Sequence, residues 1–99
     1  MKYAHTFTLK SRIQFDNAFL WYLEKSELVG DSFRVAVGIR IEQICENPAL
    51  YRKAKKQFRE AIIKKYPFSI IFTIDEANQL IIITSIFHHK QHPKKKYKR

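Results

Sequence analysis

The first pattern along the chain alternates between large and small side chains and predicts a β-strand. In the stretch YAHTFTL (residues 3–9), every second side chain from Tyr3 to Leu9 is large, and alanine or threonine stands between. Ser11 and Gln14 then have the spacing of a helix-capping box. The apolar residues behind them recur at helical intervals: Phe15, Ala18, Phe19 and Tyr22. The pattern therefore predicts a strand followed by a first helix over residues 11–25.

A second helical stripe begins after the sequence SELVGD. Its apolar residues are three to four positions apart: Phe33, Val37, Ile41 and Ile44. Asp31 or Ser32 can serve as the N-cap, and Asn47-Pro48 predicts the end of this helix. Gly38 costs a helix interior roughly 1 kcal/mol relative to alanine, so we expect it to permit a close helix–helix approach. The two helices should form an antiparallel hairpin.

The second half of the chain changes to a β pattern. Three segments rich in Ile, Phe and Thr follow one another, QFREAII, PFSIIFTI and LIIITSIF, and the links KKYP and DEANQ are short. Sequential strands with short links predict an antiparallel meander, one face of which the helical hairpin can cover. The expected fold is α+β with the order β-α-α-β-β-β. We expect one domain over residues 1–93 and a basic tail, KKKYKR, over residues 94–99.

Charge is distributed unevenly, and this points to an acidic partner. Residues 1–50 carry six basic and six acidic side chains, whereas residues 51–99 carry thirteen and three, which accounts for the whole net charge of +10. Such asymmetry favours a polyanion or an acidic protein partner, although a merely solvated basic face is the alternative. The single cysteine, Cys45, excludes an internal disulfide and is expected to be buried. Without a visible signal sequence or a membrane-length apolar run, we expect a cytoplasmic protein.

The basic segment YRKAKKQFREAIIKKY (residues 51–66) combines cations with aromatic side chains. It holds seven Lys or Arg residues against one acid, Glu60, a composition typical of contacts with phosphates and bases. Part of these lysines can equally project into water from a linker. Arg59 lies inside an expected strand, on the same face as Ala61 and Ile63. Its guanidinium suits either a bound anion or a structural pair with Glu24 or Glu42.

Three histidines crowd the end of the last expected strand: His88, His89 and His92. No cysteine or acidic residue accompanies them and Pro93 follows, so we expect no metal site and no cofactor. Strand alternation sends His88 and His89 to opposite faces. Imidazole can donate or accept a proton near neutral pH, so a histidine beside Arg59 could serve phosphoryl transfer. A histidine that is only hydrogen-bonded is the alternative.

Taken in order, these features resemble the RelE/ParE superfamily of toxins from bacterial type II toxin–antitoxin systems. The resemblance runs from about Phe15 to Lys96. The matching pieces are Trp21-Tyr22, Asn47-Pro48, Arg59, Tyr66-Pro67-Phe68, Phe72, and His88 with Pro93. It implies a helical hairpin on a small antiparallel sheet and an antitoxin partner with an acidic toxin-binding arm. No Gly-rich phosphate loop or Ser-His-Asp order accompanies these pieces.

Two activities occur in that superfamily: cleavage of messenger RNA on the ribosome, and inhibition of DNA gyrase. For RNA cleavage, the resemblance assigns Arg59 and Lys64 to the scissile phosphate and His88 to proton transfer. Nucleic acid or target contacts would come from further residues of the basic half: Arg52, Lys53, Lys65, Lys90 and Tyr97. Glu60 is a candidate base by proximity alone. The overall pattern favours gyrase inhibition, and a basic nucleic-acid-binding domain without toxicity is the third hypothesis.

Overall fold

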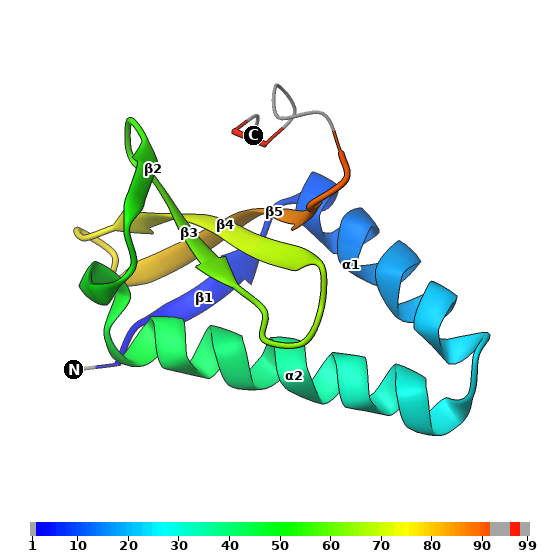
Figure 1. Cartoon of the computed structure of the whole chain (residues 1–99). Coiled ribbons are helices and arrows are strands. Elements are labelled where there is room, and N and C mark those ends of the chain that lie inside the picture. The colour runs from blue at the N-terminus through cyan, green and yellow to red at the C-terminus, as the bar shows by residue number, and fades with distance from the viewer. Residues whose placement is uncertain (1, 92–95, 98–99) are drawn as a thin grey trace.

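Two helices pack on one face of a five-stranded sheet in the computed structural model, which describes residues 2–91 and 96–97 (Figure 1). The elements in chain order are β1 (Ala4–Phe7), α1 (Leu9–Leu23), α2 (Glu27–Glu46), η1 (Pro48–Leu50), β2 (Lys53–Lys55), β3 (Phe58–Ile62), β4 (Phe68–Asp75) and β5 (Leu80–His88). The expected α+β fold is confirmed. The expectations for His92, Pro93 and most of the basic tail fall outside the described residues.

The sheet contains the expected meander and, on either side of it, one further strand. β3, β4 and β5 pair antiparallel, and β1 lies parallel to β5 at one edge. At the other edge, β2 pairs antiparallel with β3, which gives the strand order β1-β5-β4-β3-β2. The sequence did not predict β2, because its three residues, KAK, have no apolar alternation to read.

The first helix begins two residues earlier than the capping-box prediction. Thr8 is the N-cap, and its hydroxyl accepts a hydrogen bond from the Ser11 backbone N–H at 3.2 Å. The Ser11 hydroxyl is instead buried and donates to the carbonyl of Ile83 at 2.7 Å. Gln14, the other half of the expected box, accepts the backbone N–H of Ile86 at 2.9 Å. Both polar side chains therefore fasten α1 to β5.

The second helix also begins earlier than predicted, and a different glycine permits the helix–helix approach. Ser26 caps α2 by accepting the Val29 N–H at 3.0 Å, so the N-cap is neither Asp31 nor Ser32. A Cβ added at Gly30 would lie 2.9 Å from the Leu23 Cα, whereas one at Gly38 would meet no atom within 4 Å. The prediction for Gly38 was wrong because that residue faces open space, and Gly30 stands where the hairpin is tightest.

Aromatic rings fill the core between the helices and the sheet. Phe33 is fully buried, and its ring centroid lies 4.7 Å from Tyr22, 5.2 Å from Tyr66 and 5.5 Å from Phe68. Cys45 is buried as expected, and its burial raises the pKa of the thiol and so disfavours the reactive thiolate. These rings fix α1, α2 and the β3–β4 turn as one packed unit.

A β-bulge at Thr84 decides which way the end of β5 faces. Ile71 pairs with Ser85 but Phe72 pairs with Ile83, so Thr84 is an extra residue in β5. Its hydroxyl donates to the carbonyl of Ile71 at 3.2 Å. Beyond the bulge, the alternation of β5 is shifted by one position. This shift sets the directions of His88, the last residue of β5, and of His89, which follows it.

Candidate functional site

The face of the sheet that the helices leave uncovered carries the candidate site. Phe58, Ile71 and Phe87 form a small apolar cluster there, from three neighbouring strands, and Tyr97 packs against it. Figure 1 shows α2 below the sheet, α1 descending beside the sheet toward α2, and residues 96–97 (red) above the sheet. We call this surface the open face, and its polar residues include Glu60, Ser69, His89, Arg52 and Lys96.

Glu60 lies at the centre of the polar residues of the open face. One oxygen, Oε2, lies 2.8 Å from the Lys96 Nζ, and the other, Oε1, accepts from Arg52 at 3.2 Å. Only 8% of its side chain is exposed. Alternation along β3 places Glu60 on the face opposite to Ala61, whose side chain is buried in the core beneath the helices. Glu60 is therefore a nearly buried carboxylate held between two cations.

Ser69 connects this carboxylate to His89. The Ser69 hydroxyl is fully buried, hydrogen-bonds the Glu60 carboxylate, and lies 2.8 Å from the His89 Nε2. A hydroxyl has one proton, so if Ser69 donates to Glu60 it must accept from His89, which then carries its proton on Nε2. The three side chains form a continuous chain of hydrogen bonds from the buried carboxylate to the exposed imidazole.

The environment of Glu60 keeps its carboxyl ionised. Burial by itself would raise its pKa, but hydrogen bonds from Lys96 and Ser69 and the charges of Lys96 and Arg52 outweigh burial and lower the pKa. An ionised carboxylate linked through a hydroxyl to an imidazole can accept and pass a proton. With Lys96 in place, however, both carboxylate oxygens are already engaged. Ser69 itself is too deeply buried to act as a nucleophile.

Arg59 does not lie beside a histidine. It faces the helical side of the sheet, where its guanidinium donates to the carbonyl of Tyr51 at 2.6 Å. Of the two alternatives for Arg59, the ion pair with Glu24 or Glu42 does not form among the described residues, and Glu42 pairs with Lys2 instead. Arg59 is opposite Phe72 on β4 and His88 is opposite Phe68, so about 13 Å of strand separate them in the strand direction alone.

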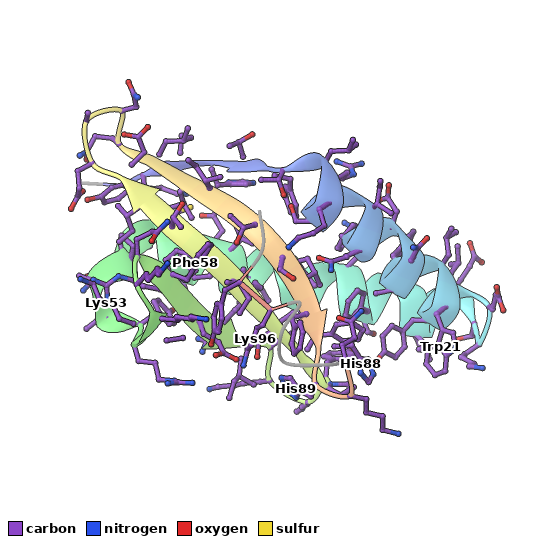
Figure 2. All side chains as sticks on the ribbon, turned by 90° about the horizontal axis from the view of Figure 1, so that it is seen from above. Trp21, Lys53, Phe58, His88, His89 and Lys96 are labelled. Atoms are coloured by element: carbon purple, nitrogen blue, oxygen red, sulfur yellow. The ribbon has the colours of Figure 1, made fainter. Side chains whose placement is uncertain are left out.

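His88 and His89 do face opposite sides of the sheet, as the alternation predicts. His88 turns toward the helices, where its ring meets that of Phe68 edge to face with 4.8 Å between the ring centroids. Its Nδ1 accepts the backbone N–H of Lys90 at 3.0 Å, so a neutral ring carries its proton on Nε2. Beside it is a cavity of about 440 Å³ lined by Ala18, Trp21, Tyr22, Pro67, Phe68, His88 and Lys90. In Figure 2, Trp21 lies near the C-terminal end of α1, on the opposite side of the molecule from Lys53.

The remaining sequence candidates are spread over the molecule. Lys64 and Lys65 follow β3 and line a groove against the outer side of α2. Lys53 is exposed on the edge strand β2, and Lys90 stands beside the His88 cavity. Of the residues predicted to bind a target, only Arg52 and Tyr97 lie on the open face. The predicted catalytic set of Arg59, Lys64 and His88 therefore has no common centre.

Analysis of the sequence missed most of the polar residues of the open face, and the reason can be given for each. Ser69 was a readable signal, because it is the one polar side chain in the apolar run FSIIF. His89 was placed on the face opposite to His88 but with no partner, since nothing in the sequence reveals the register shift in β5 or the contact with Ser69. Lys96 was assigned to a basic tail outside the domain, yet it pairs with Glu60 from 36 positions further along the chain.

Two further surveys cover residues 2–91 and 96–97. Over these residues, no group of three histidine, cysteine, aspartate or glutamate side chains is placed to hold a metal ion. His92, one of the three candidate ligands, lies outside them. In the same part of the chain, neither helix has the length and apolar character needed to cross a bilayer.

Comparisons with known proteins point to one family. Residues 6–93 match the family model described as the ParE toxin of the type II toxin–antitoxin system, parDE. Individually curated proteins give no match. The fold resembles a chain of the toxin–antitoxin complex RelBE2 from Mycobacterium tuberculosis, at 13% identity and a TM-score of 0.59 over 89% of this chain and 99% of that one. A chain of the chromosomal ParDE system from P. aeruginosa gives 20% identity and a TM-score of 0.60, over 88% and 96%.

Proposed function

Because the chain belongs to the family of ParE toxins of type II toxin–antitoxin systems, we propose that it inhibits DNA gyrase by binding rather than by chemistry. One observation carries this proposal: the basic residues and the histidine expected to cleave RNA are dispersed. Arg59 is occupied by a backbone carbonyl, and His88 lies about 13 Å further along the sheet. A hydrolytic centre needs its groups within hydrogen-bond reach of one reacting atom.

The partner that restrains the toxin is a cognate antitoxin, and we propose that its toxin-binding segment is acidic. The two similar structures are chains of toxin–antitoxin systems. Residues 51–99 of this chain hold the whole excess of ten positive charges, so an acidic segment is electrostatically complementary to this half. The proposed complex forms in the bacterial cytoplasm.

A supercoiling assay with purified gyrase tests the proposal. We expect the toxin to inhibit supercoiling of relaxed plasmid and to increase gyrase-dependent DNA breaks, and we expect antitoxin added beforehand to prevent both effects. Translating ribosomes serve as the parallel arm, with primer extension to detect cut messenger RNA. Active gyrase together with cut transcripts contradicts gyrase inhibition and selects RNA cleavage.

The open face supports RNA cleavage as a second candidate function. There Glu60, Ser69 and His89 form the hydrogen-bonded chain described above. In such a reaction Lys96 first leaves Oε2 of Glu60, and the freed carboxylate then takes the proton of a ribose 2′-hydroxyl, whose oxygen attacks the adjacent phosphorus. The imidazolium gives its proton to the departing 5′-oxygen, which leaves a cyclic phosphate and a 5′-hydroxyl. If ribosomes and the toxin yield cut transcripts, Glu60→Gln and His89→Gln should each abolish the cuts, whereas His88→Gln should not.

A further inference from the structure

The apolar cluster of the open face has a cover that comes from the chain itself. Phe58 and Phe87 are only 6% and 4% exposed although both helices lie on the other side of the sheet. The Tyr97 ring packs on Phe58 with 5.7 Å between centroids and 40° between planes. An exposed cluster of three large apolar side chains is unfavourable in water, so this contact stabilises the observed arrangement.

Lys96 supplies a second, polar anchor beside the first. Its Nζ lies 2.8 Å from the Glu60 carboxylate and 5.3 Å from the centre of the Phe87 ring. The side chain is 20% exposed and that of Glu60 is 8% exposed, so the pair is largely withdrawn from water. Partly buried ion pairs are screened much less by salt than pairs at the surface. Figure 2 shows Lys96 over the middle of the sheet, between Phe58 and His89.

The two anchors form a site with defined chemistry. Glu60 binds an ammonium group, and the Phe58 ring packs against the aromatic ring of the residue that follows. Lys55 lies beside this aromatic contact, with its Nζ 6.0 Å from the Tyr97 ring centroid. The ligand that fits is a lysine followed directly by an aromatic residue, which is the sequence of Lys96-Tyr97.

We propose that the open face is a binding surface for a lysine–aromatic dipeptide, and that Lys96-Tyr97 occupies it in cis as a latch. While Lys96-Tyr97 occupies the open face, neither the Glu60 carboxylate nor the Lys96 ammonium group is free to bind another molecule. Release by an acidic segment, which takes Lys96 in place of Glu60, rests on the proposed antitoxin partner. Occupation of the surface by the chain's own residues does not rest on it.

A peptide-transfer experiment tests the latch on the full chain. The probe is a labelled synthetic peptide with the sequence KKKYKR, and binding is followed by fluorescence anisotropy at physiological salt. We expect the double variant Lys96→Gln, Tyr97→Ala to bind this peptide at least about tenfold more tightly than the wild-type chain, whose site is filled. The peptide KKQAKR, which lacks both anchors, should bind both chains equally weakly.

Two matched variants control for charge and for folding. Lys53→Gln removes the same charge from an exposed position on β2 and should leave peptide binding at the wild-type level. Adding Glu60→Gln to the double variant should abolish the gain, and near-ultraviolet circular dichroism checks that the aromatic core is intact. Because the assay contains no gyrase, ribosome or antitoxin, its failure would leave the proposed function untouched.

Two results would overturn the inference. Equal binding of KKKYKR to the wild type and the double variant would mean that the surface is open in the wild-type chain. Concentration-dependent dimerisation of the wild type that the double variant lacks would mean that Lys96-Tyr97 binds a second copy of the chain. Analytical ultracentrifugation of both proteins at matched concentrations distinguishes exchange between copies from occupation in cis.

Discussion

At the scale of single residues, the surroundings of each charge decide what it can do. Arg59 and Glu60 are neighbours in sequence but lie on opposite faces of β3, one bonded to the Tyr51 carbonyl and the other paired with Lys96. The arginine that sequence reasoning chose for phosphate binding is thus a structural donor. The glutamate considered a candidate only by proximity is the centre of the open-face cluster.

Substitution of Arg59 separates a structural role from a catalytic one. We expect Arg59→Ala to lower the free energy of unfolding by about 1–3 kcal/mol, because the Tyr51 carbonyl loses its charged donor. Urea denaturation measures this loss. Arg34→Ala, which removes only an exposed pair with Asp31, should change stability by less than about 0.5 kcal/mol. Unchanged stability with lost toxicity would instead indicate a direct role of Arg59 at the target.

The Glu60 carboxyl predicts a loss of stability in acid. Its pKa is lower in the folded chain than in the unfolded chain, so the unfolded chain binds its proton first as the pH falls. The stabilisation is therefore complete above the ordinary glutamate pKa, about 4.3, and is lost as the pH falls through the lower folded value. Urea titrations between about pH 6 and pH 3 should show a shallower acid slope for Glu60→Gln than for the wild type. Equal slopes would contradict the ionised, paired carboxylate.

At the scale of elements, caps and close contacts fix the helical hairpin. Thr8 caps the N-terminus of α1 less than one turn before the predicted Ser11, whereas Ser26 caps α2 more than one turn before the predicted Asp31 or Ser32, because several residues near each start have side chains that can cap a helix. Apolar periodicity still predicted both helices, since the buried side of each is what the sheet requires. The bulge at Thr84, by contrast, has no recognisable pattern in the sequence and is seen only in the pairing register of β4 and β5.

The two glycines of α2 give opposite predictions for the same substitution. Gly30→Ala should destabilise the chain by roughly 1–3 kcal/mol, because the new Cβ meets the Leu23 backbone at 2.9 Å. Gly38→Ala should stabilise it by up to about 1 kcal/mol, because the site is open and alanine favours the helix. Thermal and urea denaturation of both variants measure the difference. Equal effects of the two changes would contradict the close approach at Gly30.

At the scale of the whole molecule, the two halves of the chain differ in both the elements they form and their net charge. Residues 1–50 build the hairpin and are neutral overall, whereas residues 51–99 build most of the sheet and carry the excess charge. Within the basic half, part of the charge is used internally, since Arg52 and Lys96 both neutralise Glu60. The cations that remain exposed, such as Lys64 and Lys65, are available to an acidic partner.

Association with the proposed antitoxin should therefore depend on salt. We expect the association rate constant to fall at least about tenfold between low and high ionic strength, measured by stopped flow. Changing Lys64 and Lys65 to glutamine should slow association, whereas changing Arg12 and Arg34, already paired with Asp16 and Asp31, should have little effect. A rate independent of salt would argue against an acidic toxin-binding segment.

The sequence by itself determined the class of fold, the helical hairpin, the central meander and the location of the charge, because these follow from periodicity and composition that are local in the chain. The tertiary structure alone decided which polar groups meet. Glu60, Ser69, His89 and Lys96 come together through strand register, one bulge and a returning C-terminal segment. Contacts between residues tens of positions apart depend on that packing, which no short pattern encodes.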